Sequence, residues 1–178
     1  RCAVDLIKDW IDKNPAGAPD AWDPFPISLR LVNWIKFLCL NDVPEEDRVV
    51  IVDSMVCQTR WLLKHLEYHL LGNHLFKNGK ALVFMGLFFK GLEAEKWLKK
   101  GLEVVGKEVD EQVLFDGGHF ERSPMYHSMV LEDCLDLLNI VDAKKKLALQ
   151  GFADILEEKT GKMAGFLFSM THPDSQIS

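Results

Sequence analysis

Two short segments of this sequence carry polar side chains whose types and spacing could support chemistry. In the first, Asn73 and His74 follow Gly72, where one predicted helix ends and the next begins. The free backbone N–H groups and partial positive charge of a helix start attract anions, so these side chains could bind an acidic group. An Asn at this position also commonly caps a helix, and spacing alone does not separate the two roles.

The second segment, residues 116–127, is polar over most of its length. A Gly117-Gly118 turn leads to Ser123-Pro124, a pair typical of a helix start. Tyr126 then falls in the first helical turn, where the helix dipole favours the phenolate and makes the side chain a better proton acceptor. The alternative is a polar loop followed by a capped helix that carries an ordinary amphipathic tyrosine.

An aromatic segment, residues 22–34, offers a different kind of contact. Trp22, Phe25 and Trp34 could stack on sugar rings, and Arg30 could pair with a carboxylate. Tryptophans in helical domains more often belong to the core or to helix interfaces, and this alternative stays open.

Metal binding has weak support in the sequence. His65 and His69 are four residues apart and would share a face of a continuous helix, which is a spacing that metal ligands use. No third ligand follows nearby, so we expect structural histidines and no metal site. None of the four cysteines forms a CxxC pair, and we expect small buried side chains.

The elements that must position these residues are helices. Apolar residues recur at helical spacing almost throughout, and no segment alternates long enough for a convincing strand. One long helix is expected from about Glu45 to the break at Gly72. The next segment, residues 75–89, is apolar on nearly every side, so it should be covered on both sides. We expect four of its residues to be largely buried: Leu82, Phe84, Met85 and Phe88.

Short loops between roughly seven predicted helices make sequential neighbours antiparallel. The sequence therefore predicts an all-α fold of antiparallel helical hairpins that form part of an incomplete α/α toroid. Residues 1–178 are expected to be a single helical toroid domain. Both ends resemble cuts in a longer chain, so the compartment stays open: periplasmic or secreted if a signal peptide precedes, otherwise cytoplasmic.

The composition narrows the class of protein further. The sequence is 48% hydrophobic and 27% charged, as in ordinary globular domains, and its formal net charge is -6 without a dense basic block. Nucleic acid is therefore not an expected partner. No apolar run approaches the about 20 residues that span a membrane. Motifs for nucleotide binding and serine hydrolysis are absent from the sequence.

Three segments in this order, residues 22–34, 67–89 and 117–127, resemble heparinase II/III-type polysaccharide lyases. The resemblance covers essentially the whole chain. It implies a helical toroid followed by a C-terminal β-sandwich domain, which is absent here, with the active site between them. It also implies β-elimination on an anionic polysaccharide that contains uronic acid, without a cofactor. The alternative is a non-catalytic or biosynthesis-associated relative that binds such a polysaccharide.

The resemblance also implies roles for individual residues. Asn73 and His74 match the motif that binds the uronate carboxylate, and Tyr126 matches the catalytic acid that often also acts as base. A further catalytic His would come from the β-sandwich. Because both lie at helix starts, and neighbouring hairpins of a toroid place equivalent ends together, we also expect Asn73 and Tyr126 to open onto one concave surface, with His74, Arg122 or His127 nearby. Five further residues are candidates for substrate binding: Arg30, Trp34, Glu121, Arg122 and His127.

Overall fold

Helices account for most of the structure. The computed structural model describes residues 2–70, 72–144, 147–172 and 174. Within these residues the elements are α1 (Cys2–Lys13), α2 (Pro24–Leu40), α3 (Glu45–Lys64), α4 (Gly72–Phe88), α5 (Leu92–Gln112), α6 (Pro124–Lys144), a 3-10 helix (Leu147–Leu149) and α7 (Gln150–Ser169). No strand forms among the described residues, and Val113 and His119 form an isolated antiparallel β-bridge. The all-α prediction is confirmed.

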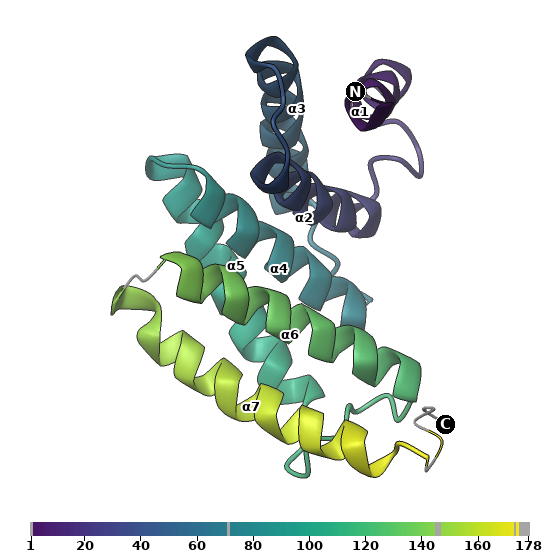
Figure 1. The fold of residues 1–178 in the computed structure, drawn as a ribbon, viewed down its shortest axis with the longest axis vertical. Helices are drawn as coiled ribbons and strands as arrows, with labels where there is room; N and C mark the ends of the chain where they lie inside the picture. The colour runs from purple at the N-terminus through teal and green to yellow at the C-terminus, as the bar shows by residue number, and fades with distance from the viewer. Residues whose placement is uncertain (1, 71, 145–146, 173, 175–178) are drawn as a thin grey trace.

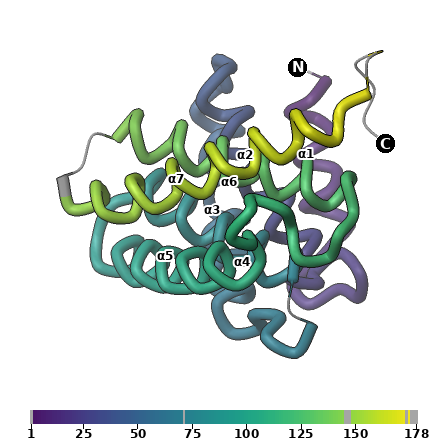
Figure 2. The backbone as a smooth tube through the Cα atoms, turned by 90° about the horizontal axis from the view of Figure 1, so that it is seen from below, coloured from purple at the N-terminus to yellow at the C-terminus, as the bar shows by residue number. Residues whose placement is uncertain are grey.

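Sequential helices pack as antiparallel hairpins. Contacts join α2 to α3, α4 to α5 and α6 to α7, while α4 also touches α2 and α6. In Figure 1, α2, α4 and α6 all begin on the right and run in the same direction. Figure 2 shows α4 and α5 side by side, with α6 and α7 beyond them. This repetition is the expected part of an incomplete α/α toroid, and it gathers three helix starts at one end.

Helix α4 lies at the centre of the packing. Every residue from position 75 to position 87 is buried, as the all-round apolar pattern predicts. Leu82, Phe84 and Met85 are buried as expected, whereas Phe88 is half-buried at the end of the helix. A Cβ placed on Gly86 would lie 2.5 Å from the backbone N of Leu98, so α4 and α5 approach backbone to backbone.

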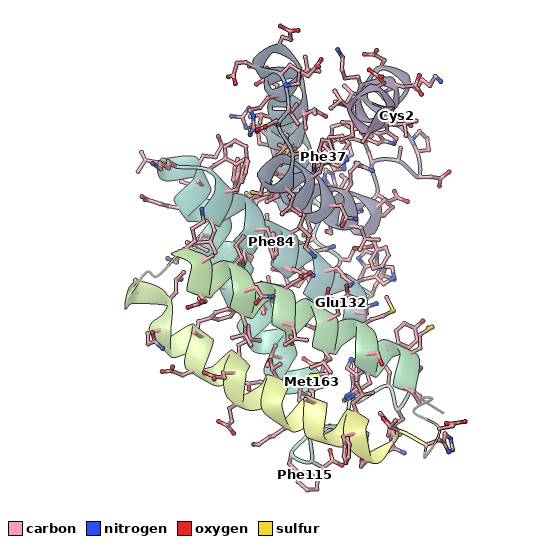
Figure 3. The ribbon with its side chains drawn as sticks, viewed as in Figure 1. Cys2, Phe37, Phe84, Phe115, Glu132 and Met163 are labelled. Atoms are coloured by element: carbon pink, nitrogen blue, oxygen red, sulfur yellow. The ribbon has the colours of Figure 1, made fainter. Side chains whose placement is uncertain are left out.

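A charged network crosses this core. Lys77 and Lys80 on α4 are both buried, and each places its Nζ 2.7 Å from the buried Asp133 carboxylate of α6. Lys36 on α2 pairs with Asp136 on α6 at 2.6 Å. Glu132 extends from the same part of α6, and Met163 of α7 lies buried between α6 and α7 (Figure 3). The ion pairs therefore join the three helices whose starts converge.

The predicted long helix from Glu45 to Gly72 is wrong. Helix α3 ends at Lys64, and His65 caps it by donating its backbone N–H to the carbonyl of Leu62 at 3.0 Å. The chain turns because Glu67 is buried instead, where its backbone N–H donates to Asn78 Oδ1 at 3.0 Å. In a continued helix, the Glu67 N–H would instead donate to the backbone carbonyl four residues earlier.

The break also removes the basis for a paired-histidine site. His65 and His69 do not share a helix face, and both are exposed. No cluster of three or more potential metal ligands of the His, Cys, Asp or Glu type occurs in the described part of the chain. The expectation of buried cysteines holds only for Cys134, since the other three are exposed. None of the described helices is long and apolar enough to cross a bilayer.

Candidate active site at three helix starts

The first turns of α2, α4 and α6 surround an open pocket with a volume of about 670 Å³. It is lined by Phe25, Leu70, Gly72, Asn73, His74, Phe120, Glu121, Met125, Tyr126 and Met129. The prediction that Asn73 and Tyr126 open onto one concave surface is therefore confirmed. Three helices begin here, and the partial positive charge of a helix start is favourable for an anion.

Asn73 lies in the first turn of α4 with an unsatisfied polar group. The preceding Gly72 has a φ of +60°, a left-handed conformation that suits glycine. Asn73 is buried, yet its Oδ1 accepts no hydrogen bond from the described residues. A capping Asn would place this oxygen on a backbone N–H of the first turn. The arrangement instead leaves an acceptor oxygen that a donor group of a ligand, such as a hydroxyl, would satisfy.

His74 is held in a defined orientation by Glu67. The Nδ1 of His74 lies 3.0 Å from Glu67 Oε1, and its ring stacks on Phe25 with centroids 4.3 Å apart. The other oxygen of the buried Glu67 accepts a bond from Asn78 Nδ2 at 2.9 Å. A carboxylate acceptor assigns the proton to Nδ1, so Nε2 is the nitrogen available to a ligand.

Tyr126 reaches the pocket from the third residue of α6. This helix begins at Pro124, as predicted, and the first helical bond runs from the His127 N–H to the Ser123 carbonyl at 2.9 Å. Tyr126 is half-buried, and the exposed Glu121 lies on the same pocket beside the start of α4. A phenol and a carboxylate therefore line the same pocket as the amide and the imidazole.

Arg122 and His127 are close to Tyr126 in sequence but do not line its pocket. Both line a second pocket of about 390 Å³, together with Phe166 and Met170 near the end of α7. His127 is buried, and its Nε2 lies 3.0 Å from the Met163 carbonyl. Each helical residue turns by about 100°, so neighbours in sequence face different directions. The structure does not bring these two candidates to the pocket of Tyr126.

Arg30 and Trp34 also lie outside both pockets, because they join α1, α2 and α3. Arg30 donates from Nε to Gln58 Oε1 at 2.7 Å, and its guanidinium lies 3.7 Å from the ring centroid of Trp10. Burial lowers the pKa of Arg30 to about 10. Trp34 is buried with its edge against Trp10. Of the aromatic segment, Phe25 is the residue that reaches the pocket.

Two supporting residues were missed by the sequence reasoning. Glu67 bonds His74 directly, and Asn78 holds Glu67; both lie in the segment 67–89, but neither was assigned a role. The available signal was Asn78 itself, a fully buried amide inside a helix that is otherwise strongly apolar. A buried amide needs several hydrogen-bond partners, so such a position indicates a polar network.

The comparisons with known proteins agree with this architecture. The family model described as heparinase II/III N-terminus matches residues 3–177. A heparin-sulfate lyase of Bacteroides stercoris is 28% identical over 93% of this chain, and another of Pedobacter heparinus is 26% identical over 93%. The chain spans only 28% and 26% of the lengths of these two proteins, respectively.

Solved structures show the same helical arrangement. A crystal structure of heparinase III matches 97% of this chain with a TM-score of 0.79 at 22% identity, over 27% of its own length. Heparan sulfate lyase HepC from Pedobacter heparinus matches 98% of this chain with a TM-score of 0.72 at 25% identity, over 28% of its length. The chain therefore belongs to the heparinase II/III N-terminus family, the helical part of a family of polysaccharide lyases.

Proposed function

We propose that this domain supplies the carboxylate-binding and proton-donating half of an active site that cleaves a uronic-acid-containing polysaccharide by β-elimination. The observation that carries the proposal is the single pocket that Asn73, His74 and Tyr126 share at three helix starts. The heparin-sulfate lyases among its relatives support this reaction class.

The chemical demand of the reaction fits this pocket. Removing the proton beside a uronate carboxylate places a second negative charge next to the first. Hydrogen bonds to the carboxylate spread that charge and lower the barrier, most effectively when the donors are already in position. Asn73 can donate from its amide and His74 from Nε2 when that nitrogen is protonated, while the helix starts add partial positive charge.

Tyr126 has the complementary role. As the electron pair of the broken carbon–hydrogen bond forms the new double bond, the glycosidic carbon–oxygen bond breaks, and the phenol donates its proton to the departing oxygen. The same side chain, as phenolate, would remove the proton beside the carboxylate. Glu121 suits the sugar hydroxyl groups, because a carboxylate accepts their hydrogen bonds and would repel an acidic substituent. These steps need no metal or organic cofactor.

The site is proposed to be completed by more of the chain. The relatives are several times longer than this chain, which spans 28% of the Bacteroides stercoris enzyme. The proposed partner is a C-terminal β-sandwich domain that forms the second wall and contributes a catalytic His, as the family resemblance implies. A closed cleft would exclude water and strengthen the hydrogen bonds on which the reaction depends.

The test uses the protein with its complete chain and a panel of uronic-acid polysaccharides. Ultraviolet absorbance of the unsaturated product reports elimination. Tyr126→Phe should abolish the signal while circular dichroism stays unchanged, because only the hydroxyl is lost. Tyr68→Phe is the matched control, since Tyr68 is the one other tyrosine of the sequence and lies outside the pocket.

Each outcome of this test separates two functions. Elimination that Tyr126→Phe abolishes and Tyr68→Phe retains would support the lyase site. An active Tyr126→Phe enzyme would place the proton donor elsewhere. Binding of the polysaccharides without any unsaturated product would favour the non-catalytic alternative.

A further inference from the structure

Gln112 lies behind the candidate site and contacts both halves of it. It is the last residue of α5, is fully buried, and does not line the pocket. Its side chain makes three hydrogen bonds, which go to Gly72, Glu108 and His119. Gly72 begins the turn of Asn73, whereas His119 belongs to the loop that leads to Tyr126. One amide therefore connects two segments far apart in sequence.

The bond to α4 fixes the point where that helix begins. Gln112 Nε2 donates to the backbone carbonyl of Gly72 at 2.9 Å. Gly72 is in the left-handed region, so the direction of its carbonyl differs from that of an ordinary first-turn residue. Asn73 follows Gly72 directly. The bond from the Gln112 amide to Gly72 therefore also fixes the position of Asn73 in the first turn of α4.

The bonds to the loop fix the approach to α6. Gln112 Oε1 lies 3.1 Å from His119 Nε2, and His119 Nδ1 accepts the backbone N–H of Glu121 at 3.4 Å. Burial lowers the pKa of His119 to about 4, so the ring is neutral at neutral pH and Nε2 carries its one proton. The backbone carbonyl of Gln112 also accepts the backbone N–H of Phe120 at 2.9 Å.

Only an amide satisfies all of these partners. The Gly72 carbonyl and Glu108 Oε2 both require donors, while the His119 Nε2–H requires an acceptor. The Gln side chain offers two donor hydrogens and one acceptor oxygen at the required ends. A carboxylate at this position would keep the acceptor but could not donate to Gly72.

From these contacts we infer that Gln112 is a positioning residue for the elimination reaction, holding the Asn73 segment and the Tyr126 segment in one arrangement. This inference rests on the proposed function, because the proposed function is what assigns a reaction to the pocket. Gln112 acts through geometry alone, because it holds residues of the pocket wall but does not itself line the pocket in which a substrate would bind.

The experiment compares Gln112→Met with Gln58→Met in the complete protein. Gln58 is the matched control, because it is also fully buried and hydrogen-bonded, yet its partners Arg30 and Ser54 lie outside the pocket. Hydrogen–deuterium exchange should rise in Gln112→Met only, at residues 76–78, whose amides make the first helical bonds of α4, and at residues 120–122. The kcat of Gln112→Met should fall by about 100-fold with little change in KM, as expected for misaligned reacting groups.

Gln112→Glu provides a second, nearly isosteric variant if the methionine variant does not fold. It should increase exchange at residues 76–78 while the loop at 120–122 keeps its protection, because the carboxylate still accepts from His119. Unchanged exchange at either segment in Gln112→Met, or an equal loss of kcat in Gln58→Met, would overturn the inference. A wild-type protein without lyase activity would refute the proposed function, and the exchange data would still decide whether Gln112 couples the segments.

Discussion

Acidification should destabilise this domain through His119. The imidazole is 2% exposed, and both nitrogens are used: Nε2 faces Gln112 Oε1 at 3.1 Å and Nδ1 accepts the Glu121 N–H at 3.4 Å. Burial, with a smaller contribution from His127, lowers the pKa of His119 from 6.5 to about 4. A protonated ring has no acceptor nitrogen, so protonation removes the bond that holds the loop before Tyr126.

The sign and size of the effect follow from proton linkage. The unfolded chain binds a proton at His119 near pH 6.5, but the folded protein does so only near pH 4. Between these values the unfolded state holds more protons, so the free energy of unfolding falls as the pH falls. The difference between the two pKa values corresponds to about 3 kcal/mol in the free energy of unfolding. Of this, about 2 kcal/mol should be lost between about pH 7 and about pH 5. That is a substantial part of the stability of a typical domain.

Urea denaturation at the two pH values would measure this loss in the wild type and in His119→Gln. The glutamine can still donate to Gln112 but does not titrate, so the variant should lose about 2 kcal/mol less than the wild type. His69→Gln is the control, because His69 is exposed and meets similar solvent before and after unfolding. If the free energy of unfolding fell by the same amount in the wild type and in His119→Gln, the reasoning would be refuted. The same would hold if His69→Gln reduced this fall as much as His119→Gln.

Four further predictions concern the site and the stability of the helices around it. Asn73→Ala should raise KM and lower kcat of the complete protein in steady-state assays, because a contact to the carboxylate strengthens as charge develops. Asp133→Asn should cost about 3 kcal/mol in urea denaturation, because it leaves Lys77 buried without its counter-ion. Gly86→Ala should destabilise by about 1–3 kcal/mol, since its Cβ would lie 2.5 Å from the Leu98 backbone. Gly106→Ala, with nothing within 4 Å, should instead stabilise α5 by about 0.5–1 kcal/mol in the same assay.

The pattern of apolar residues was enough to predict the elements and their central helix. Helical spacing identified the hairpins, and an all-round apolar segment identified α4 as the buried centre. The Ser123-Pro124 pair correctly marked the start of α6. These predictions succeed because periodicity and helix-start chemistry are local properties, which neighbouring residues decide among themselves.

The end of α3 was not predictable in the same way. Local spacing favours a continued helix through residues 65–70, but the chain leaves it at Lys64. Glu67 turns inward because Asn78 offers it hydrogen bonds from another helix. A contact across eleven positions outweighs the local preference here, and no short window of sequence contains it.

The sequence by itself determined which residue types stand at the helix starts, and the expected placement of Asn73 and Tyr126 on one concave surface is present in the structure. Tertiary structure decided the rest of the site. Arg122 and His127 are near Tyr126 in sequence but face another pocket, because side-chain direction depends on the local backbone and on helical rotation. Gln112 lies behind the site because α5 packs against α4. Its hydrogen bonds to distant segments form only when these helices are packed together, so the sequence did not reveal them.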